Sequence, residues 1–394
     1  MTAAPFRKIR VLIVTDEMEV GGTQRQIVHM VLGLDRAVFE PTVLYFRNES
    51  FFVDQLDEAG IDVVRIDKRA RIDAGFVRRL RAEVSQGDYD VMHCFALTGE
   101  LWGAVVHALL PSARRPVLLT SIRNTYDWER PLHRAIKAWV MRRSWRVVAN
   151  TRAGAASAHR HMRLPDSLVH VIYNGVAAPR ATVADAAAVR AELGVAADAP
   201  LALFVGRLVE QKDVATLIRA MQQLAPQAPH LAIAGDGPLR ADLEALVAQG
   251  PALPVHFLGQ RDDVPALIAA ADMVVLPSRS EGLSNVVLES MMTGRPVVAT
   301  RVGGNVELVD HERTGLLFDT GDVTTLAASI ARLCSDPALR DALGRAARDK
   351  AHAEFSIPAM VTAFSDLYRE AAALRMRQNG TQPSLLEPHV RTPR

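Results

Sequence analysis

Short apolar runs recur along the chain, and segments with helical spacing separate them. The run IRVLIVTD at 9–16 is apolar on both faces, and the segment at 21–34 places Ile27, Val31 and Leu34 on one face of a helix. Apolar strands joined by helices are typical of a parallel, doubly wound sheet. The same pattern predicts further strands at 41–46, 63–66, 90–95, 116–122, 146–150 and 169–176.

The pattern starts again after an alanine-rich connector at 177–200. It predicts a second set of strands at 201–206, 230–235, 255–259, 272–277, 296–300 and 315–318. A chain of 394 residues is longer than one hydrophobic core usually serves. We therefore predict an α/β protein with two Rossmann-like, doubly wound domains at 1–176 and 177–370, facing each other across a cleft. A final helix at 357–376 can cross back to the first domain, and we expect the polar tail at 378–394 to be disordered.

Composition narrows the class of protein. Cys94 and Cys334 are the two cysteines, and they lie far apart, so we expect neither a disulfide framework nor a zinc site. The apolar run near the N-terminus is too short for a signal peptide, and no window offers the about 18 apolar residues of a transmembrane helix. These features fit a protein of the reducing cytoplasm.

Charge is distributed unevenly along the chain. The net charge is +2, but residues 1–175 hold 25 Lys and Arg against 19 Asp and Glu, whereas the remainder holds 21 against 25. The segment 130–163 contains nine basic residues and no acidic one. Such a surplus favours peripheral attraction to the inner membrane or to a polyprenyl diphosphate acceptor. Few aromatic residues and no recognised module argue against nucleic acid as a partner.

A helix predicted within 129–146 is amphipathic. Its wheel places Arg130, Arg134 and Lys137 on one face, with Leu132, Ile136, Trp139 and Val140 roughly opposite. A basic helix with tryptophan can lie on an anionic membrane. Alternatively, the apolar stripe packs against its own domain and the basic side faces solvent, which is the interpretation we favour for the stripe.

The stretch SRSEGLSNVVLES at 278–290 carries the main candidate chemistry. It follows a predicted strand, and Ser284 is a good N-cap for a helix whose first amides, those of Asn285 and Val286, face outward. These amides and the helix dipole favour an anion. Glu281 precedes the helix and Glu289 lies within it, and each carboxylate can accept two hydrogen bonds from a vicinal diol.

A diphosphate between two diols would fit this arrangement, and a nucleotide-sugar is such a molecule. The segment GRLVEQKD at 206–213 follows another strand and supplies two cations, Arg207 and Lys212, after Gly206, which permits a close approach of the backbone. No Asp-X-Asp run suited to a metal-bound diphosphate is present, and the two fixed cations can stabilise a departing diphosphate. Taken singly, each of these residues is as well explained by a solvated surface position or a turn.

The order of these segments resembles the family-4 glycosyltransferases, retaining enzymes of the GT-B fold. The resemblance covers residues 9–370 and rests on ADMVVLPSRSEGLSNVVLESMMTGRPVVATRVGGNVELV, FVGRLVEQKDVATLIRAM, AGDGPLR and LGQRDDVPAL, with GGTQRQ and VIYNGV in the first half. It implies that Glu289 holds the donor ribose and Glu281 the hydroxyls of the transferred sugar. It also implies that Arg207 and Lys212 bind the diphosphate, together with the backbone of Gly282, Leu283, Ser284, Asn285 and Val286. Metal independence and a front-face displacement follow from the same resemblance.

The first half offers weaker candidates. Gly21 and Gly22 open a predicted helix and either approach the donor phosphate or the acceptor or form a simple loop; the dinucleotide pattern G-X-G-X-X-G is absent. His93 at the end of a strand, and Asn124, are candidates on the acceptor side. Arg123 stands where many members of the family carry histidine. Because arginine cannot carry a proton near neutral pH, any histidine-assisted step is in doubt, although Arg123 can stabilise a developing anion.

The sequence therefore favours a hexosyltransferase that uses a nucleotide-diphosphate sugar, needs no cofactor or metal, and acts on a saccharide or lipid-linked acceptor in bacterial cell-surface polysaccharide synthesis. Two alternatives stay open. A nucleotide-sugar epimerase would use the same architecture, but the first-half loops are poor in paired carboxylates. A binding protein without turnover has Arg123 as its single support.

Overall fold

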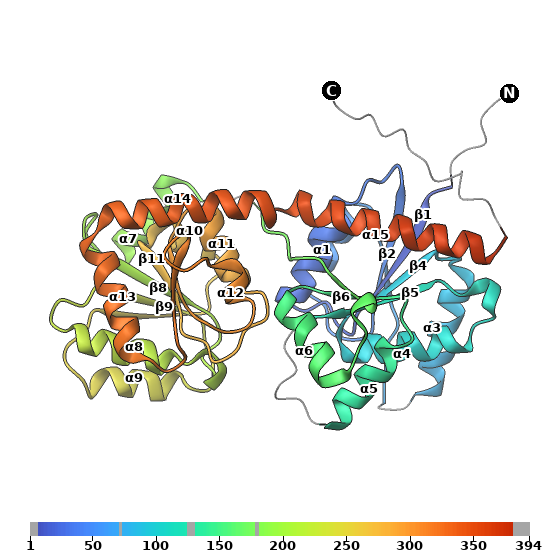
Figure 1. The fold of residues 1–394 in the computed structure, drawn as a ribbon, viewed down its shortest axis with the longest axis horizontal. Helices are drawn as coiled ribbons and strands as arrows, with labels where there is room; N and C mark the ends of the chain where they lie inside the picture. Colours follow the sequence, from blue (N-terminus) through green and yellow to red (C-terminus); the bar gives the residue numbers. More distant parts are fainter. Residues whose placement is uncertain (1–6, 71–72, 124–130, 178–180, 381–394) are drawn as a thin grey trace. The chain divides into compact units, whose positions relative to one another are not determined.

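The computed structural model describes residues 7–70, 73–123, 131–177 and 181–380 (Figure 1). The chain forms two compact units, one of residues 1–175 with 357–394 and one of residues 176–356. The division falls one residue before the predicted boundary, and the final helix belongs to the first unit. Most of the tail expected at 378–394 lies outside the described residues.

The first unit is built on a parallel sheet with the strand order β3-β2-β1-β4-β5-β6-β7 in its described part. The strands are β1 (Ile9–Val14), β2 (Phe39–Tyr45), β3 (Asp62–Arg65), β4 (Val91–Cys94), β5 (Val117–Ile122), β6 (Arg146–Ala149) and β7 (Val169–Val171). The helices are α1 (Gly22–Gly33), α2 (Phe51–Glu58), α3 (Ala74–Gln86), α4 (Ala96–Leu109), α5 (Pro131–Met141), α6 (Arg152–Met162) and α15 (Ile357–Gln378), with short 3-10 helices η1 (Ser112–Arg114) and η2 (Asp166–Leu168). Each predicted strand of this half is present.

Helices cover both faces of this sheet (Figure 1). On β1, Ile9, Val11 and Ile13 join a core that also contains residues of α1, α2 and α15. The alternate residues Leu12 and Val14 join a second core with residues of α3 and α4. Successive side chains of a strand point to opposite faces, so a strand buried on both faces must be apolar throughout.

The second unit repeats the design with the strand order β10-β9-β8-β11-β12-β13 in its described part. Its strands are β8 (Leu201–Val205), β9 (His230–Ala234), β10 (Val255–Gly259), β11 (Met273–Leu276), β12 (Val297–Thr300) and β13 (Gly315–Phe318). Its helices are α7 (Val183–Glu192), α8 (Val214–Leu224), α9 (Arg240–Ala248), α10 (Val264–Ala270), α11 (Asn285–Thr293), α12 (Asn305–Leu308), α13 (Val323–Ser335) and α14 (Pro337–Glu354), with the 3-10 helix η3 (Glu210–Lys212). The prediction of two doubly wound domains is confirmed. Among the described residues, none of the helices has both the length and the apolarity needed to cross a bilayer.

The side of helix α5 that packs against its domain differs from the side that we expected from the sequence. Ala138 and Met141 pack inward with β5, β6 and α6, and Lys137 is buried with an exposed fraction of 6%. Leu132 and Trp139, expected in the packed stripe, are instead 65% and 40% exposed. The expected arrangement is thus wrong for Leu132 and Trp139, whereas Val140 of the same stripe is fully buried as expected.

A buried ion pair attaches α15 to the first sheet. Arg375, which is 3% exposed, donates to Asp90 Oδ1 at 2.8 Å and to Asp88 Oδ1 at 2.7 Å. Asp90 is 1% exposed and also accepts from the backbone N–H of Arg10 on β1 at 2.9 Å. Removing one partner of such a pair leaves a charge buried without compensation.

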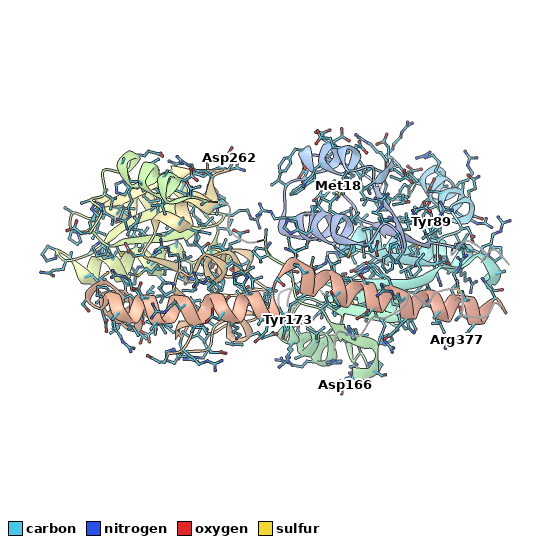
Figure 2. The ribbon with its side chains drawn as sticks, turned by 90° about the horizontal axis from the view of Figure 1, so that it is seen from above. Met18, Tyr89, Asp166, Tyr173, Asp262 and Arg377 are labelled. Atoms are coloured by element: carbon cyan, nitrogen blue, oxygen red, sulfur yellow. The ribbon has the colours of Figure 1, made fainter. Side chains whose placement is uncertain are left out.

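We predict that Arg375→Ala lowers the free energy of unfolding by about 3 kcal/mol, because it leaves the Asp90 carboxylate buried beside the more distant Arg7. Chemical denaturation of the whole chain measures the change. Arg377→Ala is the matched control, since Arg377 lies two residues further on α15 (Figure 2), is exposed and has no ion pair within the described parts of the chain. It should change the stability by less than about 0.5 kcal/mol; equal effects of the two variants would contradict the prediction.

Candidate active site

The strand order of the second sheet reverses between β8 and β11. From β8 the chain continues to β9 and β10 on one side, whereas β11 is followed by β12 and β13 on the other. The chain that leaves β8 and the chain that leaves β11 therefore continue toward opposite edges of the sheet. Ligands of open α/β sheets bind at such a point. The two loops are 206–213 and 277–284, which hold most of the predicted donor-site residues.

Backbone and side-chain bonds tie the two loops together. The N–H of Arg279 donates to the carbonyl of Gln211 at 2.8 Å, and Gln211 Nε2 donates to the carbonyl of Ser280 at 2.9 Å. Arg279 also pairs with Asp213 at 3.3 Å, where the chain enters α8. The relative position of the loops is thus fixed by contacts within one unit.

The predicted residues Lys212 and Glu281 meet where the loops join. Lys212 Nζ lies 2.5 Å from Glu281 Oε1, and Ser278 Oγ donates to the same oxygen at 2.6 Å. Glu281 is 6% exposed, so this pairing compensates a carboxylate that has lost most of its water. Ser278 was not predicted; its position directly after Pro277, at the end of a strand, was the available signal.

The start of α11 offers a set of backbone donors. Ser284 is the N-cap, and its Oγ accepts from the N–H of Val287 at 3.4 Å, which confirms the predicted cap. No hydrogen bond among the described residues uses the backbone N–H of Gly282, Leu283, Ser284 or Val286. Unused amides at the positive end of a helix favour an anion.

Glu289 lies on α11 one turn beyond Asn285, and the side chains of both are half-buried. Arg207 directly follows Gly206 at the end of β8 and is exposed; its guanidinium makes no hydrogen bond or ion pair within the described parts of the chain. The Cβ position of Gly206 lies 3.6 Å from Lys212 Cε, so this glycine borders the same lysine. The second unit therefore has Arg207 and Lys212 in the loop after β8, Glu281 in the loop after β11 and Glu289 on helix α11.

Two glycines that were not predicted as site residues shape these loops. Gly303, in the loop after β12, has a φ of +49°, and a Cβ there would lie 1.8 Å from the carbonyl oxygen of Glu281. Gly235, after β9, leaves room in the same way for the carbonyl of Gly206, at 1.9 Å from its Cβ position. A side chain at either position would displace a loop of the site.

The strand order of the first sheet also reverses, between β1 and β4. Gly21 is the N-cap of α1, no side chain caps it, and Gly22 is the first helical residue. Further along α1, the buried Gln26 donates to the carbonyl of Gly175 at 3.0 Å and accepts from its N–H at 2.9 Å. The glycine pair thus opens a helix as predicted, and the same helix holds the point at which the chain leaves this unit.

His93 lies inside the first unit. It is fully buried, its Nδ1 is 2.8 Å from Tyr368 Oη on α15, and its Nε2 is 2.8 Å from Ser121 Oγ. Burial, with a smaller contribution from the positive charge of Arg123, holds the pKa of His93 well below its ordinary value. A neutral histidine with both nitrogens engaged has a structural role, so the structure gives no support to the predicted role of His93 on the acceptor side.

Arg123 follows β5 and is half-buried. Its NH1 donates to Asn174 Oδ1 at 2.8 Å, and its guanidinium lies 4.9 Å from the centre of the Phe95 ring. These contacts hold the arginine between the end of β4 and the segment that leads to Gly175. Asn124, the other candidate on the acceptor side, lies outside the described residues.

A cavity of the first unit lies away from these residues. It has a volume of about 850 Å³ and is lined by the start of β5, by Arg143 and Trp145, and by the end of α15. This is the amino edge of the first sheet, opposite the edge that bears Gly21 and Arg123. Within the described residues, no group of three or more His, Cys, Asp and Glu side chains is arranged to hold a metal ion.

Comparison with known proteins identifies the family. The model described as Glycosyltransferase Family 4 matches residues 20–179, and that described as Glycosyl transferases group 1 matches residues 199–336. The D-inositol 3-phosphate glycosyltransferase of Saccharomonospora viridis is 33% identical over 317 residues, which cover 75% of this chain and 73% of that enzyme. The chain belongs to the family-4 glycosyltransferases. The predicted resemblance is thereby confirmed, and the protein is a glycosyltransferase.

Other relatives extend the comparison. The lipopolysaccharide core biosynthesis glycosyltransferase LpsD of Rhizobium meliloti is 36% identical over 187 residues, which span 47% of this chain and about half, 54%, of that enzyme. Among solved structures, HepE of Anabaena in complex with UDP has a TM-score of 0.83 at 23% identity, over 92% of this glycosyltransferase and 100% of that chain. The structural similarity to HepE supports the GT-B fold.

We predict that Gly303→Ala lowers kcat/KM of this glycosyltransferase by about a hundredfold, because the added Cβ moves the backbone of Glu281. Gly321→Ala is the control: Gly321 has a φ of +77°, but no atom lies within 4 Å of its Cβ position. Both variants carry backbone strain, so only the Glu281 displacement distinguishes them. Steady-state turnover measures the effect, and an equal loss in the two variants would show that strain alone is responsible.

We also predict a pH-dependent stability. Because the folded pKa of His93 is depressed, its contribution is complete above the unfolded pKa of about 6.5 and is lost as the pH falls below it. Denaturation at about pH 7 and pH 5 should show a loss of about 1.4 kcal/mol per pH unit from this residue. His29 and His107, whose pKa values burial also lowers, add to the same trend.

The variant His93→Gln should remove the His93 part of this slope, whereas His133→Gln, at an exposed histidine of α5, should leave it unchanged. A slope that His93→Gln does not alter would contradict the assignment.

Proposed function

We propose that this glycosyltransferase transfers a hexosyl unit from a nucleotide-diphosphate sugar to a saccharide or lipid-linked saccharide, with retention of configuration. The observation that carries the proposal is the meeting of Lys212 and Glu281 beside the amides of α11, at the reversal point of the second sheet. A pyrophosphate is the anion that this combination suits, because a cation and backbone donors face the same place.

In the proposed complex, the amides of 282–286 bind the diphosphate together with Lys212 and Arg207. Glu289 accepts hydrogen bonds from the two ribose hydroxyls, and Glu281 accepts from hydroxyls of the transferred sugar. We infer that the first unit binds the acceptor, with Gly21, Gly22, Arg123, Asn124 and His93 as the candidate residues. We infer that Arg123 binds a negatively charged acceptor group rather than moving a proton.

The reaction that we propose needs no protein nucleophile. The bond between the anomeric carbon and the diphosphate oxygen breaks while the acceptor oxygen attacks from the same face, and the acceptor proton passes to the departing diphosphate. Lys212 and Arg207 stabilise the negative charge that develops on the leaving group. Because these fixed cations provide the charge, we expect turnover to persist after chelation of divalent metals.

The names of relatives bear on the pathway. LpsD acts in lipopolysaccharide core biosynthesis by its name, and HepE was crystallised with UDP and with UDP-glucose. We therefore place this enzyme in bacterial cell-surface polysaccharide synthesis, in the cytoplasm and at the membrane face, with UDP-sugars first among the donors. A thermal-shift panel of UDP-, GDP- and ADP-sugars, each with and without Mg²⁺, identifies the donor.

We predict that two acidic residues have separable roles. Glu289→Ala should weaken binding of both the donor and the free nucleotide by about tenfold, because two hydrogen bonds to the ribose are lost. Glu281→Gln should leave nucleotide binding nearly unchanged and lower kcat by about a hundredfold, because it acts on the transferred sugar. Calorimetry and single-turnover kinetics provide the two measurements.

Glu244→Ala is the control, since Glu244 is an exposed acidic residue of α9 that pairs with Arg240 on the same helix. Negligible effects of both site variants would remove the proposed pocket. Donor binding without transfer or hydrolysis would instead indicate a binding protein, and a changed sugar in the absence of an acceptor would indicate an epimerase.

A further inference from the structure

Helix α5 presents an apolar stripe to solvent. Leu132, Ile136 and Trp139 follow the spacing of one helix face; Leu132 is 65% exposed, Trp139 is 40% exposed and Ile136 is half-buried. The opposite side, with Ala138 and Met141, already fills the core against β5, β6 and α6. Single exposed apolar residues are ordinary, but large ones aligned on a helix whose other side is packed mark an interaction surface.

A basic side chain completes this stripe. Arg143 lies one turn beyond Trp139, its guanidinium is 3.9 Å from the centre of the indole ring, and its NH1 donates to the carbonyl of Trp139 at 3.1 Å. The stacking keeps the cation over the aromatic face and directs both groups to the same side of α5. We call Leu132, Ile136, Trp139 and Arg143 the α5 surface.

The α5 surface lies in a part of the chain that is rich in arginine. Helix α6 packs beside α5 (Figure 1); its Arg160 is exposed, and so is Arg163, the residue that directly follows the helix. Within the described residues, no acidic side chain pairs with Arg142, Arg143, Arg160 or Arg163. The whole segment 130–163 contains nine basic residues and no acidic one. The positive charge is therefore available to an anionic partner.

We infer that the α5 surface docks this enzyme on an anionic lipid bilayer. Tryptophan and leucine enter the boundary between headgroups and acyl chains, and arginine binds the lipid phosphates beside them. A stable protein–protein interface requires about 20–30 residues on each side, far more than this narrow stripe, and the excess of arginine near the stripe favours an anionic surface. The inference deepens the proposed location at the membrane face and does not depend on which sugar is transferred.

The test uses the full chain and sedimentation with vesicles of phosphatidylcholine alone or of equimolar phosphatidylcholine and phosphatidylglycerol. The wild type should bind the anionic vesicles, and added salt should weaken the binding. Trp139→Ala should weaken it by about tenfold, and Arg143→Gln by about fivefold. Phe51→Ser on α2, where Phe51 is 58% exposed, and Arg81→Gln at an exposed arginine of α3 are the matched controls and should bind like the wild type.

A second readout locates the contact. Brominated lipid should quench tryptophan fluorescence of the wild type, and the quenching should largely disappear in Trp139→Phe, which retains an aromatic side chain and most of the binding. Equal binding to neutral vesicles, controls as weak as the site variants, or unchanged quenching would overturn the inference. Dimerisation that Trp139→Ala abolishes would assign the surface to a second copy of the chain instead.

Donor binding measured without vesicles distinguishes the two proposals. If UDP-sugar binding fails while anionic vesicles still bind through the α5 surface, the proposed reaction is wrong and the docking surface stands.

Discussion

The contact between Lys212 and Glu281 depends on the order of the strands. A buried carboxylate is costly unless a cation or donor compensates it, and here a lysine and a serine do so at 2.5 and 2.6 Å. The lysine follows β8 and the glutamate follows β11, so they meet only because these strands are neighbours despite their distance in the chain. The reversal of strand order thus comes first, and the ion pair, the loop bonds and the unused amides of α11 follow from it.

The first unit shows that the same architecture does not by itself create a reactive site. Its strand order also reverses, between β1 and β4, yet His93 at the end of β4 has both ring nitrogens engaged inside the core. In this unit α15 places Tyr368 against the histidine. In the second unit, the backbone N–H groups of Gly282, Leu283, Ser284 and Val286 at the start of α11 stay unused within the described part of the chain. Loops and covering helices, rather than the sheets, therefore separate the two halves in function.

The sequence predicted the strands well because each is an apolar run buried on both faces. It made Arg207, Lys212 and Glu281 candidates because each follows a strand, and Glu289 because it lies on the helix after Glu281. It did not reveal contacts between distant segments. The approach of Gly303 to Glu281 depends on two loops that meet only in the folded sheet. The burial of His93 depends on Tyr368, 275 residues away. Neither of these two contacts leaves a local pattern in the sequence.

Helix α5 shows the same limit in a single element. Its large apolar residues suggested the packed side, but Ala138 and Met141 form contacts with the core together with Val140, while Leu132 and Trp139 stay exposed. Once these residues fill the core, Leu132 and Trp139 add nothing to its packing and remain in solvent, where exposed apolar area opposes solubility. Their alignment beside arginines that pair with no acidic side chain in the described parts of the chain is therefore not explained by folding. A partner with an apolar interior and a negatively charged surface would bind both the stripe and the arginines.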